Sequence, residues 1–322
     1  MHLLSHRDGP DARHSETERI TEMRKLRVEL VATVAGLALV AGLSGQAKAD
    51  PEFTINPNQA GVTVPTVTTF TANEINGVSS ALITELTGTG GLGSTQSEQG
   101  YIEFSNFFDS NTNNFPFTGM GQAGGGFYGV YGVFTATSTT TVGVVGSANN
   151  ENSLTTLTAN FYYDPGNGDT YAFATPGHAA TVTDVGSNDV LLASATLVSG
   201  VSGFDSSGGP FLNATLAFAI CSGSGTALLG STPVPDAACT SNIGTSFFAA
   251  PVPFFDLAFE EANTTYTNVS TDGTFPGTGG TAAIKTDTVG VNFETVPEPA
   301  SLALIGSGIF GLGLLRRKSK RG

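Results

Sequence analysis

One acidic turn carries the side chains best suited to hold a metal ion. Asp164, Asn167 and Asp169 place three oxygen-bearing side chains within six residues, and hard cations such as calcium prefer oxygen ligands. The spacing departs from the EF-hand loop, because Gly166 and Gly168 stand at its third and fifth ligand positions. Asp, Asn and Gly are also the ordinary residues of tight turns. Calcium binding here is one hypothesis and a plain turn is the other; no further metal or cofactor is expected.

Catalysis is not expected from the remaining reactive residues. His178 is the only histidine after residue 22, it follows a turn-like Pro-Gly pair, and no G-x-S-x-G nucleophile motif accompanies it. Asp184 and Asp189 flank a second turn, and they belong with the calcium hypothesis because their side chains offer oxygen ligands as well. Two carboxylates that meet in space could still hydrolyse a glycan, although the chain has no Trp and this part of it has no Arg. A glycan-active enzyme therefore stays the weaker alternative.

Two cysteines, Cys221 and Cys239, are the only ones in the chain. In a compartment that permits oxidation, a single pair favours a disulfide, with two free thiols as the alternative. Closing a loop of this length contributes about 3 kcal/mol in the chain-entropy model. The intervening residues are rich in Gly, Ser and Pro, so a crosslink would restrain an otherwise mobile stretch.

The charge of the central part excludes several functions. Between residues 50 and 297 there are 20 acidic residues and one cation, Lys285, which gives a formal charge of −19. Nucleic-acid binding requires several cations to neutralise phosphates, so no nucleic-acid partner is expected. Anionic lipid surfaces are excluded for the same reason.

Strand patterns dominate this central part, and no amphipathic helix of useful length is found. Apolar residues alternate with polar ones, and Gly, Asn, Asp and Pro separate the segments. The clearest stretches are 100–105, 126–134, 139–145, 157–163, 191–197, 212–220 and 289–293. Loops are expected at 87–99, 111–126 and 270–280. The pattern predicts an all-β, antiparallel β-sandwich over residues 50–295, with a jelly roll as one form of it.

The last 27 residues, 296–322, have three consecutive parts. Pro297-Glu298-Pro299 is followed by 16 uncharged residues and then by a basic end. The basic side chains are Arg316, Arg317, Lys318, Lys320 and Arg321. Such a segment predicts a single transmembrane helix with its cations on the cytoplasmic side. A permanent C-terminal anchor would need only the apolar and basic parts.

The start of the chain has a different composition. Residues 1–22 are polar and suggest a start codon placed too early, with Met23 as the true start. Residues 23–49 have the charged, apolar and small-residue regions of a secretory signal peptide. Ala47 and Ala49 mark its signal-peptidase site. Secretory translocon and signal peptidase are therefore expected partners.

The order of motif, apolar segment and basic end resembles the PEP-CTERM sorting tail. That resemblance implies an exosortase as partner, a transient anchor in the inner membrane, and cleavage near Pro297-Glu298-Pro299. The central part is similar to the flocculation-associated PEP-CTERM proteins. This similarity rests on four stretches, 128–135 (Y-G-V-Y-G-V-F-T), 160–170, 189–204 and 246–255, together with residues 291–294, which lead into the tail.

Together these features predict an exported protein of a Gram-negative bacterium. After its tail is processed, it is expected at the cell surface or in the extracellular matrix. The resemblance implies that it supports flocculation or biofilm formation together with exopolysaccharide, without catalysis. A secreted carbohydrate- or calcium-binding module is the alternative.

Overall fold

The computed structural model describes residues 51–121, 126–263 and 267–294. The chain divides into two units, residues 1–48 and 49–322, and every described residue belongs to the second. The predicted early start, signal peptide and sorting tail lie outside the described residues. Within the described ranges, no helix has the length and apolarity needed to cross a membrane.

The described part of the chain is built from antiparallel strands with one helix of five residues. The predicted antiparallel all-β body is therefore confirmed. In chain order the elements are β1 (Phe53–Ile55), β2 (Phe70–Ala72), β3 (Glu74–Thr87), β4 (Thr95–Phe108), β5 (Tyr128–Val142), β6 (Asn150–Pro165), β7 (Thr170–Ala172), β8 (Thr181–Thr183), β9 (Val190–Phe204), β10 (Pro210–Gly223), β11 (Thr226–Leu229), β12 (Thr232–Pro235), α2 (Ile243–Phe247), β13 (Phe248–Ala250), β14 (Leu257–Asn263), β15 (Thr267–Thr271) and β16 (Thr281–Glu294).

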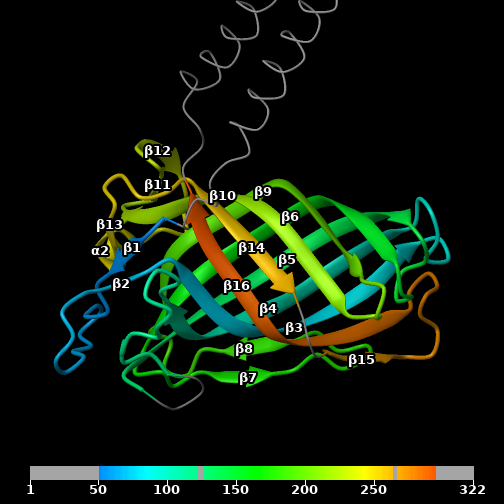
Figure 1. Cartoon of the computed structure of the whole chain (residues 1–322), viewed down its shortest axis with the longest axis horizontal. Helices are drawn as coiled ribbons and strands as arrows, with labels where there is room; N and C mark the ends of the chain where they lie inside the picture. The colour runs from blue at the N-terminus through cyan, green and yellow to red at the C-terminus, as the bar shows by residue number, and fades with distance from the viewer. Residues whose placement is uncertain (1–50, 122–125, 264–266, 295–322) are drawn as a thin grey trace, which may run out of the picture. The chain divides into compact units, whose positions relative to one another are not determined.

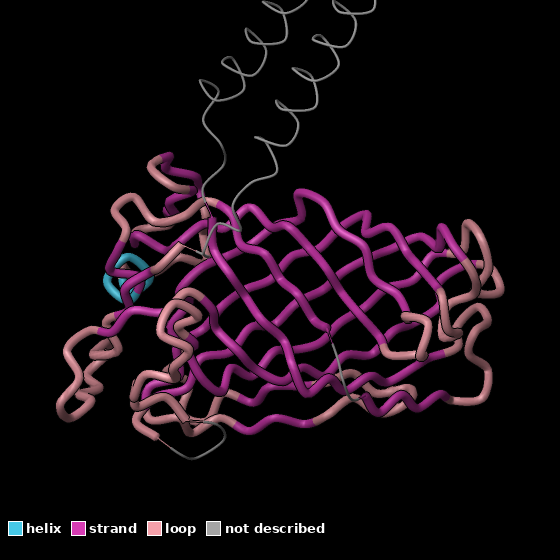
Figure 2. Tube along the Cα trace, in the orientation of Figure 1, coloured by secondary structure: helices cyan, strands magenta, loops and turns pink. Residues whose placement is uncertain are grey.

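Eight strands form one closed antiparallel sheet (Figure 1, Figure 2). They pair in chain order as β3, β4, β5, β6, β9, β10, β14 and β16, and β16 pairs back onto β3. β15 pairs with β16 beyond the end of β14. Each strand therefore has a neighbour on both sides, and the sheet encloses its own core like a barrel.

This closure corrects the predicted β-sandwich and its jelly-roll form. Alternating apolar and polar residues show that one face of each strand is buried. They do not show what lies opposite that face, which can be a second sheet or the far wall of the same sheet. Here the far wall belongs to the same sheet, because β16 pairs with β3 over ten residue pairs.

Aromatic side chains fill one end of the enclosed space. Phe104 stacks on Phe161, and Phe161 meets Phe218 edge-to-face at 5.4 Å between ring centroids. Phe218 in turn lies 4.9 Å from Phe293. All four are buried. This end is covered by α2 and by a small sheet with the strand order β13-β1-β2; Phe53 of β1 packs on Phe293 at 5.1 Å.

The other end of the enclosed space contains several buried polar side chains beside apolar ones, and we call it the polar end. Glu85 of β3, Gln96 of β4 and Thr140 of β5 are buried and joined by hydrogen bonds. Next to them Glu98 lines a pocket of about 40 Å³. These polar side chains explain two differences between the sequence pattern and the structure. The pattern predicts no strand at β3, and the loop expected at 87–99 includes the first residues of β4.

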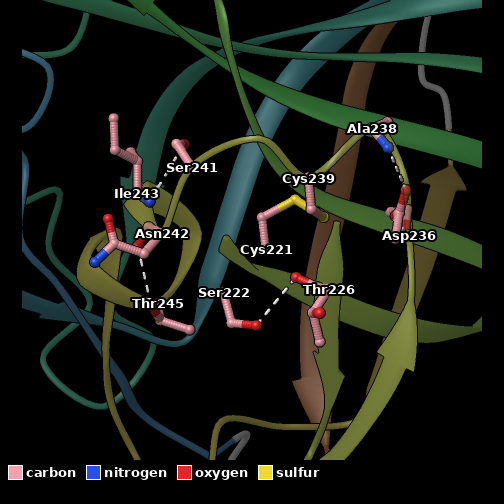
Figure 3. Close-up of a disulfide and its surroundings, with 11 residues drawn as sticks. Cys221, Ser222, Thr226, Asp236, Ala238, Cys239, Ser241, Asn242, Ile243 and Thr245 are labelled. Carbon is pink, nitrogen blue, oxygen red and sulfur yellow. Dashed lines mark hydrogen bonds between the residues drawn. A yellow bond between two sulfur atoms is a disulfide. The ribbon is translucent and has the colours of Figure 1, made fainter. Parts of the chain in front are cut away.

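Two excursions leave the closed sheet. The first is the β11–β12 hairpin, which follows β10. Cys221 at the end of β10 and Cys239 after β12 form a disulfide across it (Figure 3). Both cysteines are fully buried in a small apolar cluster with Leu191 and Ala219. The crosslink therefore fixes the base of this excursion.

The second excursion joins β6 to β9 and contains the β7–β8 hairpin; we call residues 166–188 the arm. Figure 1 shows β7 and β8 outside the closed sheet, alongside β3. Tyr171 of the arm packs on Tyr101 at 5.3 Å and on Tyr131 at 5.9 Å. The Ala174 amide donates a hydrogen bond to Ser80 Oγ at 2.9 Å. The arm thus covers outward-facing side chains of β3, β4 and β5.

Candidate functional site

Three carboxylates meet at the base of the arm. Asp164 lies near the end of β6, Asp169 immediately precedes β7, and Asp189 immediately precedes β9. One carboxylate oxygen of each lies within 4.8 Å of the others. Because β6 and β9 pair with Tyr163 opposite Val190, the topology brings the two ends of the arm to one place.

A tight turn positions the first two carboxylates. Gly166 and Asn167 adopt left-handed backbone conformations, with φ of 89° and 50°, which Gly and Asn tolerate best. The Asp169 amide donates to Asp164 Oδ2 at 3.1 Å and closes the turn. Gly129 of β5 lets this turn approach, because a Cβ there would lie 2.6 Å from Asn167 Oδ1.

Each carboxylate has one oxygen that accepts a hydrogen bond. Asp164 Oδ2 accepts from the Asp169 amide, and Asp169 Oδ1 accepts from the Val185 amide at 3.0 Å. Asp189 Oδ2 accepts from the Tyr131 hydroxyl. The structure therefore holds all three side chains in fixed orientations.

The second oxygen of each carboxylate is buried and lacks a hydrogen-bond partner. These atoms are Asp164 Oδ1, Asp169 Oδ2 and Asp189 Oδ1. Asp164 is only 1% exposed and Asp169 only 2%. Unpartnered buried acceptors are rare in folded proteins and costly when they carry charge. Here three such acceptors belong to carboxylates that meet at one place.

Burial also changes the acidity of the cluster. It raises the pKa of Asp169 above its ordinary value. Burial raises the pKa of Asp189 to about 7, and the neighbouring Asp169 carboxyl reinforces this, although the Tyr131 hydrogen bond opposes it. Lys285 is the one Lys or Arg among the described residues, and its Nζ lies 4.2 Å from the centre of the Phe173 ring. A proton or a bound cation would relieve this concentration of negative charge.

The sequence hypothesis identified part of this cluster. Asp164 and Asp169 come together in one turn as expected, and Asn167 is buried in the same turn. The sequence places Asp189 with Asp184 at a second turn instead. Asp184 is exposed and accepts a hydrogen bond from the Asn188 amide. The signal that identifies Asp189 is its position directly before β9, the strand that pairs with β6.

The pocket at the polar end of the closed sheet is a different kind of site. Its lining includes a single carboxylate, Glu98, next to Asn152, Ser202 and Phe134. Burial raises the pKa of Glu98 to about 7. The paired acids that a glycosidase requires do not meet in this pocket. His178 lies exposed on the arm, where its amide donates to the Thr175 carbonyl.

The predicted sorting and processing residues lie outside the described residues. They are Pro297, Glu298 and Pro299, the basic residues from Arg316 to Arg321, and Ala47 and Ala49. A comparison with family models matches the PEP-CTERM protein-sorting motif to residues 295–318. Searches of curated proteins and of solved structures find no match. The chain thus carries a PEP-CTERM sorting motif, which indicates export and exosortase-dependent sorting to the cell surface.

Proposed function

We propose that this protein is a surface or matrix protein that supports exopolysaccharide-associated flocculation or biofilm formation. The observation that carries the proposal is the PEP-CTERM motif at residues 295–318, directly after β16. In this proposal the signal peptide at residues 23–49 directs secretion. The tail then anchors the chain transiently in the inner membrane until exosortase cleaves near Pro297-Glu298-Pro299.

The described part of the chain suits an extracellular structural role. Its disulfide is typical of oxidising compartments. Closing the main sheet pairs strand edges that would otherwise template aggregation. The strong negative charge favours solubility and mutual repulsion. Association between cells would then come from the shared polysaccharide, with the protein acting without catalysis.

Complementation of a deletion strain tests this proposal. The wild-type gene should restore aggregation, and a variant with Pro297, Glu298 and Pro299 changed to alanine should not. Intact mass should show a processed chain for the wild type and a full-length chain in the membrane fraction for the variant. Unchanged aggregation in the deletion strain, at equal exopolysaccharide content, would count against the proposal.

A carbohydrate-binding or glycan-active module is the rival function. Incubating the purified protein with matrix polysaccharide separates the three cases. The proposed structural role predicts unchanged polymer size, whereas an enzyme would shorten the polymer. Saturable binding by calorimetry without flocculation in cells would favour the binding module.

A further inference from the structure

We propose that Asp164, Asp169 and Asp189 bind one calcium ion, which fastens the base of the arm to the closed sheet. The site stands on its own geometry and does not depend on sorting or flocculation. Its basis is twofold: the three carboxylates meet with one oxygen of each within 4.8 Å of the others, and each carries a buried oxygen that has no hydrogen-bond partner, namely Asp164 Oδ1, Asp169 Oδ2 and Asp189 Oδ1.

The spacing of these oxygens fits one coordination sphere. Calcium binds oxygen at 2.3–2.6 Å, so two ligands on opposite sides of the ion lie at most about 5 Å apart. All three carboxylates offer oxygens within 4.8 Å of one another. The other oxygen of each carboxylate is already held by a donor on the protein, so the ligands are oriented before an ion arrives.

A shared proton is the competing explanation, and it leaves the site incomplete. One proton between two carboxylates satisfies two oxygens and removes one of three charges. The third oxygen would stay buried without a partner, at a cost that buried polar groups rarely bear. A divalent cation contacts all three oxygens and offsets two charges at once.

The ligand chemistry selects a hard cation. The cluster consists of carboxylates, with no histidine or cysteine among its members, whereas zinc and copper prefer nitrogen and sulfur. Magnesium requires near-ideal octahedral geometry and gives up its water reluctantly. Calcium accepts irregular arrangements of six to eight oxygens, with water or bidentate carboxylates completing the shell. Calcium therefore fits three ligands drawn from separate turns.

Binding at this point joins both ends of the arm. Asp164 and Asp169 precede β7, and Asp189 follows β8, so the ion would close a loop of about 25 residues. The disulfide closes the β11–β12 hairpin in a similar way, across a sequence separation of 18. The folded state binds the ion and the unfolded chain does not, so calcium should stabilise folding. We expect a dissociation constant on the order of 0.1–1 mM, as in extracellular calcium modules.

Terbium luminescence and thermal unfolding of the protein purified from cells expressing the full chain test the site. Terbium accepts calcium's oxygen ligands, and Tyr131 contacts Asp189, so excitation of tyrosine should give terbium emission that calcium displaces. Calcium at 100 times its dissociation constant should raise the melting temperature by about 5–10 °C.

Three substitutions make the test specific. Asp169→Asn and Asp189→Asn keep the side-chain shape and should weaken calcium binding by at least about tenfold. Glu151→Gln, at an exposed position on β6, is the control and should leave both signals unchanged. Because the first two variants remove a buried charge, they should fold in the absence of calcium.

Several results would overturn the assignment. Absence of terbium emission and of a calcium shift in the wild-type protein would leave the shared proton as the explanation. Identical titrations of the wild type and Asp169→Asn would show diffuse binding by the acidic surface. An equal shift with magnesium at the same concentration would overturn the choice of calcium.

Discussion

The buried carboxylate at the polar end of the closed sheet and the three carboxylates at the base of the arm differ in how many of their oxygens accept hydrogen bonds. Glu85 lies at the polar end of the closed sheet and is completely buried. Its Oε1 accepts a hydrogen bond from the Gly90 amide at 3.3 Å, and its Oε2 accepts one from Gln96 Nε2 at 3.2 Å. At the base of the arm, each carboxylate has one oxygen satisfied and one without a partner.

This difference distinguishes acids whose oxygens are all satisfied by protein donors from acids that still have an oxygen free to bind a ligand. Neutral donors already satisfy both oxygens of Glu85, so this carboxylate needs no ion. Asp272 follows the same rule at the surface, where residues 274, 275 and 281 donate to its two oxygens. Unsatisfied oxygens, and not the number of acids, therefore mark the calcium site.

Removing the satisfied acid should have the largest effect. Glu85→Ala leaves the Gly90 amide and one Gln96 donor buried without their acceptor, so we expect a loss of about 3 kcal/mol in the free energy of unfolding. Urea unfolding measures this loss. Glu151→Ala, at an exposed position on β6, is the control and should stay within about 0.5 kcal/mol of the wild type. Equal stability of the two variants would mean that the Glu85 hydrogen bonds contribute little.

Changing an unsatisfied acid should give an effect whose sign depends on calcium. Without calcium, Asp169→Asn removes like-charge repulsion and should stabilise the protein by about 1 kcal/mol. The asparagine oxygen can still accept from the Val185 amide. With calcium, the variant should be less stable than the wild type, because it loses the ion. Urea unfolding in chelator and in calcium measures the stability difference between the variant and the wild type in each buffer. If this difference has the same sign in both buffers, Asp169 does not bind calcium as proposed.

The sequence predicts those parts of the fold whose inward side chains are apolar. The pattern predicts strands at β6, β9, β10 and β16, because every second residue is apolar over much of each strand. It predicts no strand at β3, because Gly77, Ser79 and Glu85 interrupt its inward face. A polar lining inside the sheet breaks the pattern by which buried strands are recognised.

The sequence predicts only the part of the candidate site whose residues are close together in the chain. Asp164 and Asp169 share a turn, so their spacing suggested a cation. Asp189 lies 20 residues beyond Asp169 and joins them through the pairing of β6 with β9. The unsatisfied oxygens, which distinguish a site from an ordinary turn, are defined only by the packed structure.

The pH dependence of stability should distinguish Glu98 from the cluster. The pKa of Glu98 is raised to about 7 from its ordinary 4.5, so the folded state favours the protonated acid. Stability should therefore fall as pH rises from 4.5 through 7. Asp272 has a lowered pKa because Thr281 and Thr274 donate to it, so its contribution should be lost as pH falls below its ordinary 3.8.

Saturating calcium isolates the contribution of Glu98 to this profile. Urea midpoints from pH 4 to 8 in calcium should show a decline that Glu98→Gln removes and Glu151→Gln retains. In chelator, the decline should be steeper, because burial also raises the pKa of Asp189 to about 7. If the urea midpoint of Glu98→Gln falls with rising pH as in the wild type, this carboxyl does not cause the loss of stability toward higher pH.

The smallest effect concerns the two excursions, which are fastened by different means. The Ala174 amide, bonded to Ser80 Oγ, reports on the arm. The Gly225 amide, bonded to the Cys239 carbonyl at 2.8 Å, reports on the β11–β12 hairpin. Chelating calcium should speed hydrogen exchange at Ala174 by about threefold, because the arm opens more often. Exchange at Gly225 should not respond.

Reductant should give the reverse result, because breaking the Cys221–Cys239 disulfide frees the hairpin and leaves the calcium ion in place. Exchange at Gly225 should then rise while exchange at Ala174 stays constant in calcium. Hydrogen exchange measured by mass spectrometry in calcium and in chelator, each with and without reductant, tests both amides. Each amide serves as the control for the treatment that should affect only the other. If chelator and reductant each speed exchange equally at both amides, the two excursions open together with the closed sheet. In that case neither the calcium ion nor the disulfide acts as a local restraint.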